Sequence, residues 1–155
     1  MYSRNHVKRF LRERVARPAS AGVIVENNEG EVLVLKAHYK PYWSFPGGWI
    51  EHNQTPREAA LRELEEETGI VLTASDIVFD SMVNRISDIM QSYQFIFRAI
   101  APLDLKETDI VVQASEIDTW KWVSRQHILE QREDFGGAVQ SWALRDTDLY
   151  SEQRV

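Results

Sequence analysis

The segment from Thr55 to Gly69 constrains the fold more than any other part of the sequence. Thr55 is a good helix N-cap, Pro56 suits the first helical position, and Glu58 completes a capping box with Thr55. Gly69 is a natural C-terminal stop, because glycine adopts the left-handed conformation without steric cost. The sequence therefore predicts one well-defined helix over residues 55–68, which the rest of the chain has to accommodate.

Three glutamates share one face of this predicted helix. Glu63, Glu66 and Glu67 stand at positions i, i+3 and i+4, so we expect their Cβ atoms to lie roughly 5–6 Å apart. Like charges at this spacing oppose the helix, and a divalent cation would reverse that effect. Oxygen-rich sites that retain water suit Mg²⁺ or Mn²⁺. An acidic helix face alone is usually a solvated surface. The sequence before the helix is therefore needed to distinguish a metal site from a solvated face.

The aromatic, turn-rich stretch over residues 38–49 (HYKPYWSFPGGW) ends shortly before the helix. Gly47 and Gly48 allow backbone dihedrals that a side chain would forbid, so the backbone can approach a metal or a phosphate closely. The rings of Trp43 and Phe45 can stack on a nucleotide base, and packing beneath the loop is the alternative interpretation. We expect a shaped loop over a ligand site, with Trp43, Phe45 and Gly48 as substrate-binding residues.

Taken together, these residues resemble the sequence box of the Nudix hydrolase family. The matching residues are Gly48 and then Arg62-Glu63-Leu64-Glu65-Glu66-Glu67-Thr68-Gly69-Ile70. The family pattern is Gly, five residues, Glu, seven residues, and then Arg-Glu-aliphatic-any-Glu-Glu-any-Gly-aliphatic. One defined position departs from it, because Gln54 stands where the family usually has Glu. The resemblance extends to residues 42–48 before the box and 122–124 after it.

The resemblance implies a pyrophosphohydrolase that depends on Mg²⁺ or Mn²⁺. Its substrate would be a small nucleotide, in which it cleaves a diphosphate linkage of a nucleoside diphosphate derivative or a nucleoside triphosphate. A metal-activated water would attack the phosphorus. Matched by position, the resemblance assigns the metal to Glu63, Glu66, Glu67 and the backbone carbonyl of Gly47.

Further catalytic roles also follow from the resemblance. Arg62 would orient Glu63, and on the same helix it can also reach Glu66. Members of such families often add a carboxylate from a later loop. We favour Glu116 for that role, with Glu107 and Asp109 as alternatives. The general base would be Glu63 or Glu116.

The departure at Gln54 leaves a second class of function open. Glutamine keeps a carbonyl that accepts hydrogen bonds but loses the charge, so we expect weaker activity or altered metal affinity. A catalytically weak nucleotide-binding sensor is therefore the alternative to an enzyme. An isomerase on the same scaffold is less favoured, because the Arg-Glu…Glu-Glu block is intact. The neighbouring Asn53 is easier to explain, since Asn tolerates the left-handed region well.

Patterns along the rest of the chain predict an α/β fold, with a mixed β-sheet sandwiched between helices and an added N-terminal helix. A β-hairpin is expected from the apolar runs at 21–25 and 32–35, because turn residues occupy 27–30. The strand over 93–100 has apolar side chains on both faces and should be central. The other expected elements are strands at 77–83 and 120–123 and helices at 124–132 and 137–145.

The N-terminal segment differs in charge from the rest of the chain. Residues 4–15 have apolar side chains at helical spacing, and Pro18 ends the pattern. Within residues 1–17, Glu13 is the only acidic residue, and the remaining chain carries a net charge of about −11. The six basic residues are Arg4, Lys8, Arg9, Arg12, Arg14 and Arg17. We therefore divide the chain into a basic N-terminal helix over 1–17 and a single catalytic domain over 18–155.

Composition narrows the environment and the partners. The 155 residues favour one domain, and no apolar run approaches the roughly 20 residues of a membrane helix. The net charge of −6 argues against a general nucleic-acid binder. Cysteine is absent, which excludes disulfides and thiolate sites and fits a reducing cytoplasm. The basic N-terminal helix makes a homodimer one possible assembly.

Overall fold

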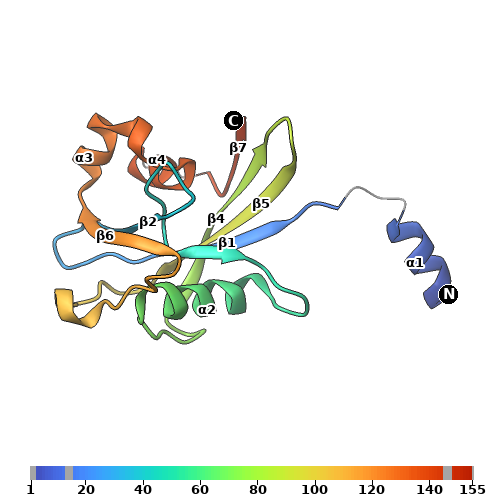
Figure 1. Cartoon of the computed structure of the whole chain (residues 1–155), viewed down its shortest axis with the longest axis horizontal. Helices are drawn as coiled ribbons and strands as arrows, with labels where there is room; N and C mark the ends of the chain where they lie inside the picture. Colours follow the sequence, from blue (N-terminus) through green and yellow to red (C-terminus); the bar gives the residue numbers. More distant parts are fainter. Residues whose placement is uncertain (1–2, 13–15, 145–147, 155) are drawn as a thin grey trace.

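The computed structural model of the chain describes residues 3–12, 16–144 and 148–154, and these form two sheets flanked by helices (Figure 1). The larger sheet is mixed, because β1–β5 and β4–β7 are parallel pairs whereas β1–β3 and β4–β5 are antiparallel. Its strands, in spatial order, are β3 (Gly47–Trp49), β1 (Ala19–Ile24), β5 (Gln91–Ala99), β4 (Ile77–Ile86) and β7 (Tyr150–Arg154). A smaller antiparallel sheet consists of β2 (Val32–Ala37) and β6 (Ile117–Val123).

Helices cover the strands on two sides. Side chains of β1 and β2 alternate between two buried clusters, so that Val23 and Leu33 belong to one and Ile24 and Val34 to the other. The first cluster packs under α2 (Pro56–Thr68), and the second under α3 (Arg125–Glu130) and α4 (Gly137–Ala143). Strands buried on both faces need nearly continuous apolar sequence. The predicted α/β fold with a mixed sheet between helices is confirmed. Two short 3₁₀ turns, η1 (Glu107–Asp109) and η2 (Arg132–Asp134), complete the described elements.

The predicted β-hairpin is correct at its turn and in the antiparallel pairing next to it, where Glu26 pairs with Val32 and the Leu33 N–H donates to the Val25 carbonyl at 3.0 Å. The side chain of Asn27 accepts hydrogen bonds from the backbone N–H groups of Glu29 and Glu31, and Gly30 is left-handed at φ 76. Beyond this pairing the two strands separate, because β1 pairs with β3 and β5 while β2 pairs with β6. Turn residues specify only the local connection. Strands that are apolar on both faces gain more by joining different sheets.

The other predicted elements exist with shifted ends, and residue 145 of the helix expected at 137–145 lies outside the described residues. The strand expected at 93–100 is β5, which lies between β1 and β4 and is central as predicted. The helix expected from Ser124 is α3, and Ser124 caps it by accepting the N–H of His127 at 3.3 Å. Two strands were not anticipated. β3 lies at the end of the aromatic loop, and β7 has the polar sequence YSEQR, which lacks apolar alternation.

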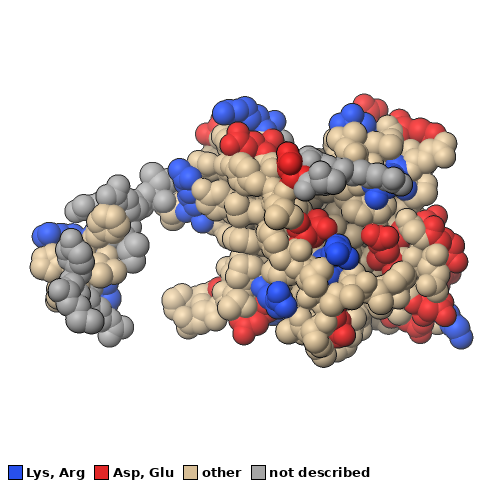
Figure 2. All heavy atoms as spheres, turned by 180° about the vertical axis from the view of Figure 1, so that it is seen from behind, with Lys and Arg blue, Asp and Glu red and all other residues tan. Residues whose placement is uncertain are grey.

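The N-terminal helix is present as α1 (Arg4–Arg12), and residues 13–15 of its predicted range lie outside the described residues. Figure 1 shows α1 apart from the body that carries both sheets. Seen from behind, acidic side chains gather at the end of the body farthest from α1 (Figure 2). The helix exposes Val7 and Phe10 together with Lys8 and Arg9. Among the described residues, no helix combines the length and the apolar character that a membrane span requires.

Candidate active site

The helix α2 is fixed at both ends by local interactions. The Thr55 hydroxyl accepts the Glu58 N–H at 3.2 Å, and the Glu58 carboxylate accepts the Thr55 N–H at 2.8 Å. At the other end, Gly69 is left-handed at φ 73, and its N–H donates to the Glu65 carbonyl at 2.8 Å. Both predicted caps are therefore confirmed. Because Leu64 is fully buried in the first core cluster, the rotation of the helix about its axis is also fixed.

Glu67 lies at the buried end of the acidic face. It is 4% exposed, and its carboxylate accepts the backbone N–H of Gly47 at 2.7 Å. Burial raises the pKa of Glu67 to about 7, although the Gly47 hydrogen bond and the charge of Lys40 act in the opposite direction. The neighbouring Gly48 leaves room for the next carboxylate, because a methyl group there would lie 2.4 Å from Glu63 Oε1. The double glycine thus brings the loop backbone against two carboxylates.

Arg62 holds the other two glutamates of this face. Its Nη2 donates to Glu63 Oε1 at 2.8 Å, and its Nη1 donates to Glu66 Oε2 at 2.7 Å. A further hydrogen bond from Nη2 to the Trp49 carbonyl, at 3.2 Å, ties the guanidinium to the loop. Burial raises the pKa of Glu63, and the charge of Arg62 opposes that rise. Arg62 is therefore in position to orient Glu63.

Glu116 lies in the loop just before β6. Its charge is among the causes that raise the pKa of both Glu63 and Glu67, so it faces the same cluster. The two rivals, Glu107 and Asp109, belong to η1, where the Asp109 carboxylate accepts a backbone N–H of its own turn at 2.8 Å. The arrangement favours Glu116 as the additional carboxylate of the site.

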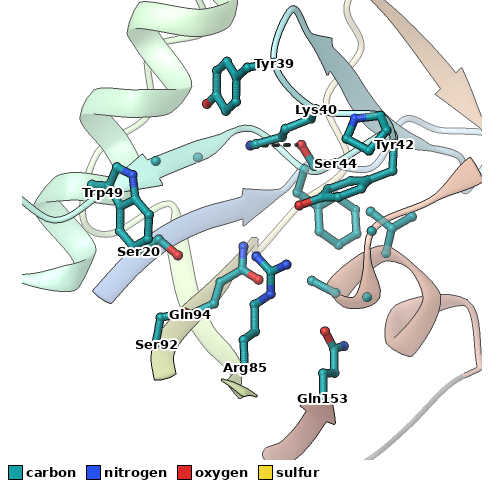
Figure 3. A pocket seen from close by; sticks show the side chains of 18 residues that line it. Ser20, Tyr39, Lys40, Tyr42, Ser44, Trp49, Arg85, Ser92, Gln94 and Gln153 are labelled. Atoms are coloured by element: carbon teal, nitrogen blue, oxygen red, sulfur yellow. Dashed lines mark hydrogen bonds between the residues drawn. The ribbon is translucent and has the colours of Figure 1, made fainter. Parts of the chain in front are cut away.

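A hollow of about 280 Å³ opens beside Gly47 and Gly48 at the start of β3, the two residues called the glycine loop below (Figure 3). Tyr39 and Lys40 connect the hollow with the carboxylates electrostatically. Both line the hollow, yet burial and the charges of Glu67, Glu116 and Glu63 raise the pKa of Tyr39, while Lys40 acts on Glu67. The aromatic and polar side chains that line the rest of the hollow include Tyr42, Trp49, Arg85, Gln94 and Gln153.

The predicted substrate-binding residues divide between the hollow and the core. Gly48 lines the hollow, and Phe45 forms part of its wall although it is 5% exposed. Trp43 is not a lining residue, because its ring packs under the ammonium group of Lys121 at 4.3 Å from the ring centre. Trp43 also packs against the second core cluster, so its contacts resemble the alternative interpretation, and a role in substrate binding stays a prediction. Sequence reasoning missed Arg85 and the two glutamines, which converge from separate strands without a common spacing.

A model of the NUDIX domain matches residues 16–141 of the chain. The chain belongs to the Nudix family. An RNA pyrophosphohydrolase from Halorhodospira halophila is 29% identical over 147 residues, which cover 84% of this chain and 80% of that protein. Over 57 residues the chain is 46% identical to an 8-oxo-dGTP diphosphatase from Proteus vulgaris, and this stretch covers 35% of this chain and 51% of the relative. The chain is thus a Nudix hydrolase, which acts on pyrophosphate linkages.

Solved structures support the same fold. A MutT protein from Methanosarcina mazei Go1 has a TM-score of 0.70 at 22% identity, covering 85% of this chain and 95% of that one. The Nudix domain of NrtR from Shewanella oneidensis, solved with ADP ribose, has a TM-score of 0.72 at 16% identity, covering 94% and 98%. The two matches cover 85% and 94% of this chain, so the Nudix fold is shown for most of its length.

Nudix hydrolases typically depend on a divalent metal, and the donors on α2 fit one. All are oxygens, which Mg²⁺ and Mn²⁺ prefer. The raised pKa values of Glu63 and Glu67 reflect crowded, partly desolvated carboxylates that a cation would relieve. Within the described residues, no three His, Cys, Asp or Glu side chains form a ready-made metal cage. Mg²⁺ does not require one, because it usually keeps several of its waters.

Gln54, which the sequence analysis identified as a departure from the family pattern, supports the turn before α2. Its side-chain carbonyl accepts the Glu51 N–H at 3.0 Å, and its own N–H donates to the Glu51 carbonyl at 3.2 Å. Within this turn Asn53 is left-handed at φ 66, which confirms the explanation given for asparagine at that position. The amide of Gln54 is therefore engaged in shaping the approach to the helix.

Proposed function

We propose that the chain hydrolyses a diphosphate linkage in a nucleoside diphosphate derivative or a nucleoside triphosphate, with Mg²⁺ or Mn²⁺ bound at α2. The observation that carries this proposal is the shared position of the glycine loop. Gly47 binds the Glu67 carboxylate and Gly48 approaches Glu63, while both glycines line the hollow. A diphosphate at the glutamates would therefore project its organic part directly into the hollow.

The proposed roles follow from these positions. Glu63, Glu66 and Glu67 would hold the ion, together with the Gly47 carbonyl. When bound, the ion would lower the pKa of a water and neutralise charge on the phosphate oxygens. Arg62 would hold Glu63 in one orientation. A carboxylate has to accept the proton of the attacking water, and Glu63 and Glu116 are the candidates.

Two further candidates rest on specific observations. The similarity to RNA pyrophosphohydrolases favours RNA that carries a 5′-triphosphate as a substrate. Gln54, in place of the usual glutamate, favours a sensor that binds a nucleotide without cleaving it. Product release distinguishes these two candidates, because the RNA hydrolase releases phosphate or pyrophosphate and the sensor releases neither.

The deciding experiment measures phosphate and pyrophosphate release with Mg²⁺ and with Mn²⁺. The substrates are the nucleoside triphosphates, ADP-ribose and other nucleoside diphosphate derivatives, and 5′-triphosphorylated RNA. We expect Glu63→Gln to lower kcat by about 10²- to 10⁴-fold, because it removes a charged ligand or base from the reacting atoms. Glu65→Gln is the matched control, since Glu65 is exposed on the same helix, and it should keep wild-type activity.

Two outcomes would contradict the proposal. Nucleotide binding without release of either product from any substrate would establish the sensor. Equal activity of Glu63→Gln and wild type would show that the acidic face of α2 does not carry the chemistry.

A further inference from the structure

Arg85 extends from β4 into the hollow beside the glutamates (Figure 3). Its guanidinium makes no hydrogen bond or ion pair with any residue that the structure describes. Arg98, on the neighbouring strand β5, instead pairs with Asp80 at 3.7 Å. Arg85 is half-buried and offers five N–H donors without an acceptor. A ligand in the hollow would supply the hydrogen-bond acceptors that the described residues do not offer to Arg85.

Two amide side chains surround Arg85 in the same hollow. Gln94 comes from β5, and Gln153 comes from β7, where it stands opposite Arg85 in the parallel pairing. Neither side chain is hydrogen-bonded to a described residue. The Gln153 amide lies against α4, and a methyl group on Gly137 would meet its oxygen at 2.0 Å. Three adjacent strands thus direct into one space polar side chains that have no hydrogen-bond partner among the described residues.

The residues that line the hollow indicate which class of ligand it can bind. Among the described residues that line it, Lys40 and Arg85 are the charged ones, and none is Asp or Glu. The charge of Lys40 acts on the carboxylate of Glu67, so Lys40 lies at the end of the hollow where the phosphates of a substrate would be bound. Figure 3 shows Arg85 entering from the opposite side, next to Gln94. The volume of about 280 Å³ lies near the lower end for ligand pockets, roughly 300–1,000 Å³, and suits a single nucleoside.

The donor geometry then distinguishes one base from another. An arginine fork donates two parallel hydrogen bonds to adjacent acceptors, and O6 and N7 of guanine form such a pair. Adenine presents a donor at N6 beside N7 and cannot accept both bonds. An amide can complement the remaining donors of a 6-oxopurine, and the rings of Tyr42 and Trp49 border the same space.

We propose that Arg85 is a specificity-determining residue that recognises O6 and N7 of a 6-oxopurine base. The preferred substrates are then guanine or hypoxanthine nucleotides. This inference rests on the proposed function, because it assumes that the diphosphate lies at the α2 glutamates.

The test compares kcat/KM with Mg²⁺ for GTP, ITP, 7-deaza-GTP and ATP. Wild type should prefer GTP and ITP, which share O6 and N7, over 7-deaza-GTP, which lacks the N7 acceptor. Arg85→Lys keeps the charge and loses the fork, so the GTP-to-ATP ratio should fall about 10- to 100-fold. Arg98→Lys, the matched control on β5, should leave that ratio within about twofold, since Arg98 does not line the hollow.

The outcomes separate this inference from the function on which it rests. An equal fall for all triphosphates in Arg85→Lys would mean that Arg85 binds phosphate, which overturns base recognition. Unchanged ratios, or equal use of GTP and 7-deaza-GTP by wild type, would overturn it as well. If no nucleotide is hydrolysed, the proposed function fails. Calorimetric binding of GMP and AMP then tests Arg85 alone, and a preference for GMP that Arg85→Lys abolishes would still support the inference.

Discussion

Folding shifts the protonation equilibrium of Glu67 strongly, and this shift predicts how stability depends on pH. The pKa rises from its ordinary value of 4.5 to about 7 in the metal-free protein. A raised carboxyl pKa means that the folded state binds the proton more tightly. The associated stability is present below pH 4.5 and is lost as the pH rises through 7. In the metal-free protein this loss should be on the order of 3 kcal/mol.

Glu67→Gln should remove this pH dependence. Glutamine keeps an oxygen that can accept the Gly47 N–H, but it carries no charge that burial can penalise. With a chelator present, the variant should gain stability relative to wild type between pH 5 and pH 8, measured by denaturant unfolding. Saturating Mg²⁺ should stabilise wild type more than the variant. Glu65→Gln serves as the exposed control, and a difference between wild type and Glu67→Gln that is independent of pH would contradict the prediction.

At the scale of elements, α2 could be predicted because its signals are local. Its N-cap, capping box and glycine stop all lie within its own sequence, and the family box added the glutamates. β7 could not be predicted, because its polar sequence forms a strand only through its pairing with Met82–Ile86 of β4. The hollow was missed for the same reason. Arg85 and Gln153 become neighbours through strand pairing, which no spacing along the chain encodes.

The capping box of α2 should contribute measurably to the stability of the protein. Thr55→Ala removes the hydroxyl that accepts the Glu58 N–H and should cost about 0.5–2 kcal/mol in the free energy of unfolding. Hydrogen bonds from Thr55 lower the pKa of Glu58, so this part of the stability is present at neutral pH and is lost as the pH falls through that lowered value. Thr55→Ser retains the cap and should remain close to wild type by urea denaturation. A loss as large in Thr55→Ser as in Thr55→Ala would show that the hydroxyl is not the stabilising group.

At the level of the whole molecule, the candidate site depends on both core clusters. The first core supports α2 and its glutamates, and the second supports α4, whose Gly137 leaves room for Gln153 in the hollow. The diphosphate end and the base end of the proposed site therefore depend on different layers. Substitutions in the second core should alter substrate choice more than metal affinity, because they move the wall of the hollow and leave the carboxylates in place.

We expect the N-terminal helix α1 to contribute little to the stability of the domain that follows it. Among the described residues, neither core contains a residue before Ala21. The segment just before β1 does contribute, because Arg17 donates to the Tyr93 hydroxyl at 2.7 Å and the Pro18 carbonyl accepts the Tyr93 N–H at 3.1 Å. A chain that begins at Ala16 should therefore unfold cooperatively with a Tm within about 4 °C of the full chain, since that range corresponds to roughly 1 kcal/mol.

A matched truncation that begins at Ala21 sharpens this test. It removes Ala19 and Ser20, the first two residues of β1, which pair with Tyr93 and Gln94 of β5. Its Tm should fall well below that of the chain that begins at Ala16, when both are measured by scanning calorimetry. An equal fall in the two chains would place α1 within the folding unit. Sedimentation of the full chain beside the chain that begins at Ala16 then tests whether α1 joins two copies, because only the full chain would form a dimer.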